Sequence, residues 1–182
     1  KKRRAQTHWK SSGIMELNVD LVNKEIGNAG EVTQLKLTQR KLCKIGDLAL
    51  CQALTRIDLS NNTLTTVAGL QTAPALNYLV VSENMLKSLS GLQFCQSLKV
   101  LNVSHNQLTN LQEVTGLENL RVLIANHNQL SALPNLTKLR LLDTLVLSHN
   151  RLDTNTLTNA GFEHLTALKK LSLSVRACLI SF

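Results

Sequence analysis

Apolar residues recur along the chain in a fixed frame, LxxLxLxxNxL, where x is any residue. Full copies begin 22 residues apart, at Leu54, Leu76, Leu98, Leu120 and Leu142. A weaker copy begins at Val32 and has Arg40 in place of the asparagine, and another begins at Leu168, 26 residues after the last full copy. A period held over so many copies predicts an array of stacked repeats rather than a single mixed core.

The first half of each copy alternates apolar and variable residues, as a short β-strand with one buried face requires. One such strand cannot bury its apolar face alone, but stacked parallel copies form a continuous core. The asparagine stands where the chain leaves the strand, so its side chain can bond backbone groups there. Stacked copies then predict a ladder of Asn62, Asn84, Asn106, Asn128 and Asn150.

The second half of each unit carries further apolar positions. One column contains Ile45, Val67, Leu89, Leu111 and Leu133, and the other contains Leu48, Leu70, Leu92, Val114 and Leu136. Their spacing of three suits a helical or 3₁₀ turn on the side opposite the strands. The longer last unit predicts a longer helix over residues 153–165.

These residues make the chain similar to intracellular leucine-rich repeats of the short 22-residue class, over roughly residues 32–174. That class includes the leucine-rich regulatory subunit of type-1 protein phosphatase, a leucine-rich axonemal dynein light chain and a spliceosomal A-prime protein. The resemblance implies an α/β solenoid, a right-handed curved array with parallel strands on the concave face and short helical or 3₁₀ turns on the convex face. It implies a shared scaffold and not a shared partner.

The ends of the chain differ from the repeats. Residues 1–13 are polar and predict a basic disordered tail, and residues 14–31 predict an N-terminal capping helix, with Leu17, Leu21 and Ile26 among its apolar positions. Residues 32–174 then hold about seven repeats. Residues 175–182 form a short apolar end with no polar cap, which we interpret as a truncated or spliced terminus or a fragment end.

The outward strand positions of successive repeats predict a binding face on the concave side. Apolar residues gather in the middle of this face and charges at its ends. The candidate partner-binding residues are Arg56, Asp58, Tyr78, Val80, Val100, Asn102, Val122, Ile124 and Val146. Since β-branched residues also favour strands for their own sake, the alternative is a sheet surface without a partner. A cluster of exposed apolar side chains favours an interaction site.

The net charge of +8 and the pI of about 9.6 invite a nucleic-acid function. Five of the 20 basic residues lie in the first ten positions, which contain none of the 12 acidic residues, so the rest of the chain is nearly balanced. Lys1, Lys2, Arg3 and Arg4 are a nuclear-localisation candidate, with a phosphate-binding arm or a solvated tail as alternatives. Direct nucleic-acid binding is therefore not the favoured interpretation.

Three histidines, His105, His127 and His149, occupy the position before successive ladder asparagines. They could bind a metal or respond to pH, but Ser-His-Asn is also a simple variant of the Ser-Asn-Asn at residues 60–62, and we assign no metal site. Cys51 and Cys95 share a core column and are interpreted as buried small apolar residues. No catalytic motif, cofactor signature or membrane span is visible.

The favoured function is a non-enzymatic scaffold or regulatory subunit, a monomer that binds a protein partner on its concave face in the nucleus, the cytoplasm or both. The alternatives are a nuclear ribonucleoprotein component and a ciliary or microtubule-associated module. The candidate partners are accordingly a phosphatase, an RNA-binding protein or a cytoskeletal protein.

Overall fold

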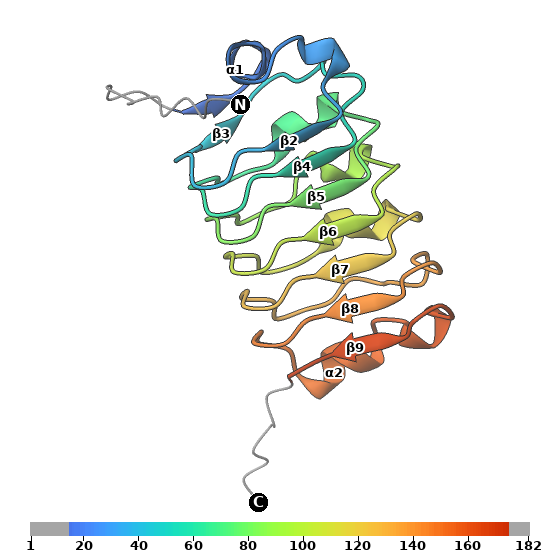
Figure 1. Ribbon diagram of the computed structural model, residues 1–182. Coiled ribbons are helices and arrows are strands. Elements are labelled where there is room, and N and C mark those ends of the chain that lie inside the picture. Colours follow the sequence, from blue (N-terminus) through green and yellow to red (C-terminus); the bar gives the residue numbers. More distant parts are fainter. Residues whose placement is uncertain (1–14, 175–182) are drawn as a thin grey trace, which may run out of the picture.

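The computed structural model describes residues 15–174, which wind into an elongated stack of similar turns of chain (Figure 1). One face of the stack is a seven-stranded parallel sheet in the order β2-β4-β5-β6-β7-β8-β9. The strands are β2 (Gln34–Lys36), β4 (Arg56–Asp58), β5 (Tyr78–Val80), β6 (Val100–Asn102), β7 (Val122–Ile124), β8 (Thr144–Val146) and β9 (Lys170–Ser172). Each unit of the period thus adds one strand beside the last, and the predicted curved solenoid is confirmed.

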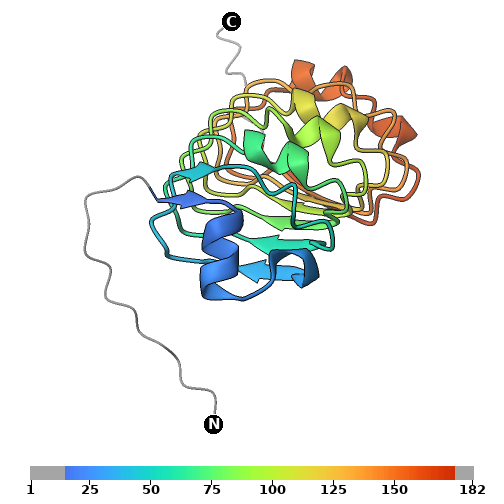
Figure 2. The same ribbon diagram turned by 90° about the horizontal axis from the view of Figure 1, so that it is seen from above.

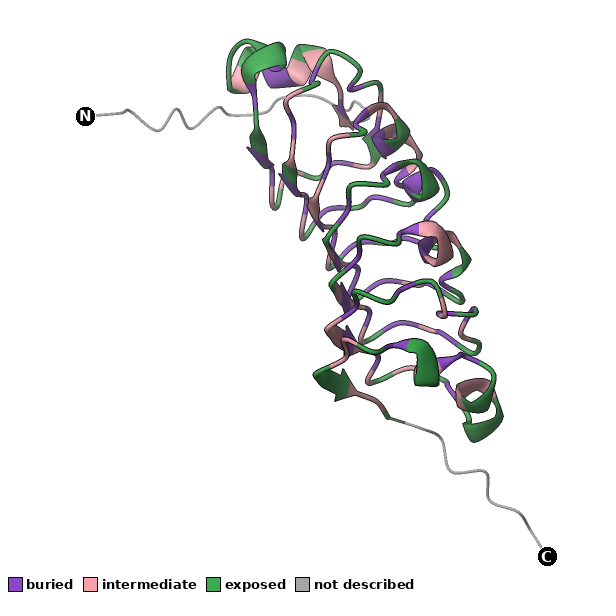
Figure 3. Cartoon of the chain, turned by 90° about the vertical axis from the view of Figure 1, so that its right-hand side faces the viewer, coloured by how far each residue is buried: buried purple, intermediate pink, exposed green. Residues whose placement is uncertain are grey.

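The alternating pattern fixes which side chains enter the core. In the seven-stranded sheet, the central residue of every strand except β9 is buried, as Leu79 and Leu101 illustrate, whereas its two neighbours point outward. The buried residues form one continuous apolar cluster between the sheet and the opposite turns (Figure 3). Leu171 of β9 is 47% exposed, because no described strand lies beyond it.

Short helical turns cover the side of the core opposite the sheet (Figure 2). The 3₁₀ turns are η2 (Ala68–Thr72), η3 (Leu92–Phe94), η4 (Gln112–Gly116) and η5 (Phe162–His164). The unit after β7 has no helical turn and contains Pro134. The single longer helix predicted over residues 153–165 is wrong. The segment instead forms α2 (Thr154–Thr158) and then η5, because Gly161, with a left-handed φ of 75°, separates them.

The N-terminal cap is built differently from the helix predicted over residues 14–31. A strand, β1 (Glu16–Leu17), pairs in parallel with β3 (Lys44–Ile45), and the helix α1 covers only Val19–Glu25. The side chain of Asn18 caps α1 by accepting a hydrogen bond of 3.0 Å from the backbone N–H of Leu21. Such a cap marks the first turn of a helix. A 3₁₀ turn, η1 (Ala29–Glu31), then leads into β2.

The asparagine ladder is confirmed. The Asn106 side chain donates to the carbonyls of Val81 and Val103, at 3.0 Å each, and accepts 2.9 Å from the Leu86 N–H. Each ladder asparagine therefore ties its own strand end to the preceding repeat. Arg40 occupies the asparagine position of the first repeat, which is next to α1 and not to another repeat. Its guanidinium forms an ion pair with Glu25 of that helix at 3.3 Å.

Candidate functional site: the concave sheet

The sheet register brings the predicted partner-binding residues together. Equal positions of successive repeats lie side by side, so Tyr78 is beside Val100 and Val100 is beside Val122. The second outward column runs through Asp58, Val80, Asn102, Ile124 and Val146. All of the candidate residues therefore lie on one continuous surface that crosses β4 to β8.

The apolar residues of this surface are less exposed than we predicted. Tyr78, Val80, Val100, Val122, Ile124 and Val146 are each half-buried rather than exposed. The reason is that parallel strands about 4.8 Å apart place an outward side chain on either side of each one. The six side chains therefore pack closely against one another. We call the surface that they form the aliphatic strip.

The end of the surface near the N-terminal cap is polar. The Arg56 guanidinium lies 3.9 Å from the centre of the Tyr78 ring, a cation–π contact that holds a positive charge against the strip. The neighbouring carboxylate of Asp58 accepts hydrogen bonds from the backbone N–H of Ser60, at 3.1 Å, and from the Ser60 hydroxyl. This acid is thus already engaged by its own repeat.

A further column, which was not among the predicted site residues, borders the strip where the strands begin. Its members directly precede the strands and are joined along the backbone. The N–H of Arg121 donates to the Lys99 carbonyl and the N–H of Asp143 donates to the Arg121 carbonyl, both at 2.8 Å. Lys99 and Arg121 are exposed. The period alone would have revealed this column, because the same spacing that aligns the strip aligns these residues.

The three histidines stack just beyond the opposite ends of the strands. Their ring centres are 4.2 Å apart between His105 and His127 and 4.1 Å apart between His127 and His149, with the rings nearly parallel. All three have left-handed backbones, with φ between 53° and 57°, as do Asn61 and Glu83 in the same column. Among residues 15–174, no group of three His, Cys, Asp or Glu side chains is placed to hold a metal ion.

Stacking makes the histidine column sensitive to protonation. Desolvation, followed by repulsion from His149 and His105, lowers the pKa of His127 below its usual value. Because the folded-state pKa is lowered, the unfolded chain binds the proton more readily. The contribution of His127 to stability is therefore complete above the unfolded pKa of about 6.5 and falls as the pH falls below it.

We expect the melting temperature to decrease between about pH 7.5 and pH 5, with part of that decrease removed in His127→Asn. Asparagine is the matched replacement because Asn61 occupies the same column and tolerates the same left-handed backbone. Thermal melts of both proteins across this range measure the effect. Since other groups titrate there too, the difference between the two profiles is the observable, and parallel profiles would contradict the expectation.

The two cysteines of the core column, Cys51 and Cys95, are poor nucleophiles. Cys51 and Cys95 are buried, and burial raises the pKa of the Cys95 thiol to about 11. The pKa of Cys51 is also raised, by burial first and then by the charge of Asp47. Both thiols therefore stay protonated at neutral pH and act as small apolar core residues, as predicted.

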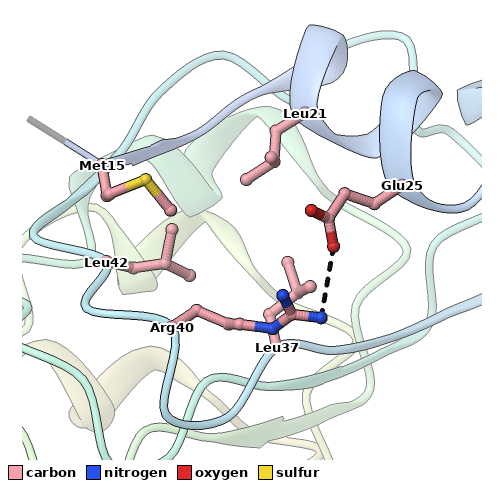
Figure 4. A pocket seen from close by; sticks show the side chains of 6 residues that line it. All are labelled: Met15, Leu21, Glu25, Leu37, Arg40 and Leu42. Carbon is pink, nitrogen blue, oxygen red and sulfur yellow. Dashed lines mark ion pairs between the residues drawn. The ribbon is translucent and has the colours of Figure 1, made fainter. Parts of the chain in front are cut away.

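A small pocket lies between α1 and the first repeat (Figure 4). Its lining consists of Met15, Leu21, Glu25, Leu37, Arg40 and Leu42. The two charged members are paired with each other, and the remaining side chains are apolar. The pocket is thus part of the joint between cap and repeats and presents no nucleophile with a base.

The localisation candidates Lys1, Lys2, Arg3 and Arg4 lie outside the described residues, as do residues 175–182. Within the described part of the chain, every helix is too short or too polar to cross a membrane.

Comparisons with known proteins agree with this architecture. A family profile described as leucine-rich repeats (2 copies) matches residues 96–138. Curated protein sequences give no match. Among solved structures, an internalin of Listeria monocytogenes is 25% identical, with a TM-score of 0.69, over 80% of this chain and 44% of that one. The chain thus spans less than half the length of that internalin.

Two further structures share the fold at lower identity. The LRIM1/APL1C complex is matched at 21% identity and a TM-score of 0.67, over 76% of this chain and 26% of the other. An internalin C2 of Listeria monocytogenes is matched at 21% identity and a TM-score of 0.62, over 90% of this chain and 77% of the other. Together with the repeated frame and the in-register sheet, these similarities show that the chain contains leucine-rich repeats and has the leucine-rich-repeat fold.

Proposed function

We propose that the protein is a non-enzymatic interaction scaffold that binds a protein partner across the aliphatic strip. The observation that carries this proposal is the placement of six apolar side chains on one continuous outward surface from β5 to β8. Apolar surfaces of this kind with polar ends are typical of protein interfaces, in which a desolvated centre is surrounded by a polar rim.

The leucine-rich-repeat architecture supports the same function. Leucine-rich repeats serve in general as protein-binding modules, because successive strands present one extended concave surface. The buried thiols Cys51 and Cys95 are protonated, and the two charged residues of the pocket at the cap are paired with each other, so neither feature competes with the strip as a functional site. A regulatory subunit is the form of scaffold that we favour.

Introducing two carboxylates into the strip, with Val100→Glu and Ile124→Glu together, is expected to abolish partner capture. The half-buried positions lie diagonally on adjacent strands, so both charges would lie near the centre of the interface and would have to be desolvated on binding. Affinity capture from a cell extract, followed by quantitative mass spectrometry, measures the loss. Circular dichroism should be unchanged, because the side chains point away from the core.

The matched control is Gln71→Glu with Gln112→Glu, which adds the same two negative charges to exposed positions in η2 and η4 on the opposite side. This control should retain every partner. Full capture by the Val100/Ile124 variant would show that the strip is not the interface.

Within leucine-rich-repeat proteins, we place the chain with the short 22-residue class and with nuclear or cytoplasmic partners. The 22-residue period, which aligns equal positions of neighbouring repeats, supports this placement. The same capture experiment separates the candidate partners, since it would enrich a phosphatase, an RNA-binding protein or a cytoskeletal protein. Fusion of residues 1–12 to a fluorescent protein tests whether the basic segment directs nuclear import.

A further inference from the structure

The two borders of the aliphatic strip differ in charge. Where the strands begin, Lys99 and Arg121 are exposed beside β6 and β7, and neither forms an ion pair with any described residue. The next member of this column is an acid, Asp143, beside β8. Where the strands end, the border carries no Lys or Arg. It consists of the hydroxyl and amide side chains of Ser82, Ser104, Asn126 and Ser148, and Glu83 and the stacked histidines follow directly after them. A ligand on the strip would therefore meet positive charge along one border only.

Basic residues also outnumber acidic residues over the concave surface and its borders. The basic residues are Lys36, Arg56, Lys99, Arg121, Lys169 and Lys170, against the acids Asp58, Glu83 and Asp143. Two of the acids are engaged within the array, since Asp58 accepts from Ser60 and Glu83 accepts from the Asn61 amide at 2.9 Å. The concave surface is thus positive, although the repeats as a whole are nearly balanced.

The dimensions of the strip suit one α-helix. From β5 to β8 there are three strand spacings of about 4.8 Å, or about 14 Å in total. At 1.5 Å per residue, a helix laid along this direction would span the strip with about ten residues, close to three turns. Each strand contributes three residues to the width, about 10 Å, which matches the diameter of a helix with its side chains.

We propose that the partner element is an amphipathic α-helix that lies across β5–β8, with its apolar stripe on the aliphatic strip and acidic residues along the flank that faces Lys99 and Arg121. This inference rests on the proposed function and adds the chemistry of the partner. Apolar contact supplies the affinity, whereas the one-sided charge selects among helices with similar stripes and speeds association.

The one-sided charge also sets the direction of the bound helix. A helix whose apolar stripe faces the sheet can run from β5 to β8 or from β8 to β5. Turning it around exchanges the flank beside Lys99 and Arg121 with the flank beside Ser104 and Asn126. A helix with acids on one flank therefore binds in one direction only.

The surface favours a protein helix over a nucleic acid. Single-stranded nucleic acids bind through aromatic side chains on which the bases stack, together with a positive groove. The strip contains one aromatic side chain, Tyr78, and the Arg56 guanidinium already lies against its ring. The remaining strip residues are aliphatic and offer no stacking surface.

The test uses two peptides of about 14 residues, each held helical by a side-chain staple because free helices of this length are marginal in water. They share one leucine stripe and differ on one flank, which carries glutamates in the first and lysines in the second. Fluorescence anisotropy measures binding to the full chain, to Lys99→Glu/Arg121→Glu and to the control Lys87→Glu/Lys138→Glu. The control reverses the same number of charges at exposed positions outside the strip borders.

We expect the glutamate peptide to bind the unaltered protein at least tenfold more tightly than the lysine peptide, a preference that weakens as salt is added. The Lys99/Arg121 variant should reverse the preference, and the control should keep it. Equal binding of both peptides, lost in Val100→Glu/Ile124→Glu, would overturn this inference and leave the proposed interface standing.

Two other outcomes would also be decisive. Failure of both peptides to bind the unaltered protein would contradict the helix-binding inference. If the Val100/Ile124 variant also captured partners normally, the proposed function would fail with it. A single-stranded RNA 20-mer that bound the protein more tightly than either peptide, and lost binding in the Lys99/Arg121 variant, would assign this border to nucleic acid instead.

Discussion

Replacing Asn106 with alanine is expected to lower the free energy of unfolding by about 3 kcal/mol or more. The substitution removes a buried side chain that donates to the carbonyls of Val81, Val103 and Ser104 and accepts from the Leu86 N–H. The N–H of Leu86 would be left buried without this partner, and each such orphaned group costs about 1–3 kcal/mol. Because domains are stable by only about 5–15 kcal/mol, chemical denaturation should show a large shift of the midpoint.

Asn110→Ala is the matched control. Its side chain also accepts a backbone hydrogen bond, 3.1 Å from the N–H of Gln112, but it is exposed, so water replaces the lost oxygen. A loss of well under 1 kcal/mol is expected there, as for ordinary surface substitutions. Equal midpoints for the Asn106 variant and the unaltered protein would show that the ladder does not hold neighbouring repeats together.

Gly69→Ala is expected to destabilise the protein by about 2–3 kcal/mol, as overpacking of a tightly packed site does. A β-carbon at Gly69 would collide with the Ile45 carbonyl oxygen and lie 2.5 Å from that of Gly46. Both obstacles are backbone atoms of the preceding repeat, so no side chain can rotate away. The turn of η2 would have to move away from β3, and the strain should appear as a lower melting temperature.

Gly116→Ala provides the comparison, because the nearest atom to its added β-carbon is the side-chain amide of Gln96 at 3.9 Å. Neither glycine has a left-handed φ, so the pair separates the close approach of repeats from backbone freedom. The Gly116 variant should match or slightly exceed the unaltered protein in stability, since alanine restricts the unfolded chain. Similar melting temperatures for the two variants would contradict the proposed steric cause.

The repeated units were predictable because each position has the same neighbours in every copy. Tyr78 and Val100 occupy equal places in the frame, and parallel strands stacked in register make equal places adjacent. The strand residues, the asparagine ladder and the outward columns follow from this single rule. The positions of Lys99 and Arg121 follow from the same rule, although both residues lie just outside the strands.

The ends were harder to predict because they lack a repeated neighbour. The apolar spacing from residue 14 to residue 27 suits a helix, yet Leu17 belongs to a strand because β3 offers it a parallel partner. Ile26, expected on the buried side of that helix, is 47% exposed because α1 ends before it. For Leu17, pairing with another strand outweighed the local helical pattern.

The half-burial of the strip also depends on the assembled sheet. Sequence alternation shows that Val100 and Ile124 point away from the core, but it does not show how closely the flanking strands shield them. The apolar area that remains available to a partner depends on that shielding. The exposed apolar area of each strip residue is therefore set by the neighbouring repeats, and no single repeat determines it.

The ladder has a consequence for how the protein folds. Its hydrogen bonds between repeats join residues 20 to 25 positions apart, as those from Asn106 and Asn128 to the preceding turn do. The contact order of the sheet is consequently low for a parallel one, since every loop that must close is about one repeat long. The array can grow by adding one turn to the end of a finished stack. As the chain emerges during synthesis, each new strand can pair with the preceding strand, which has already folded.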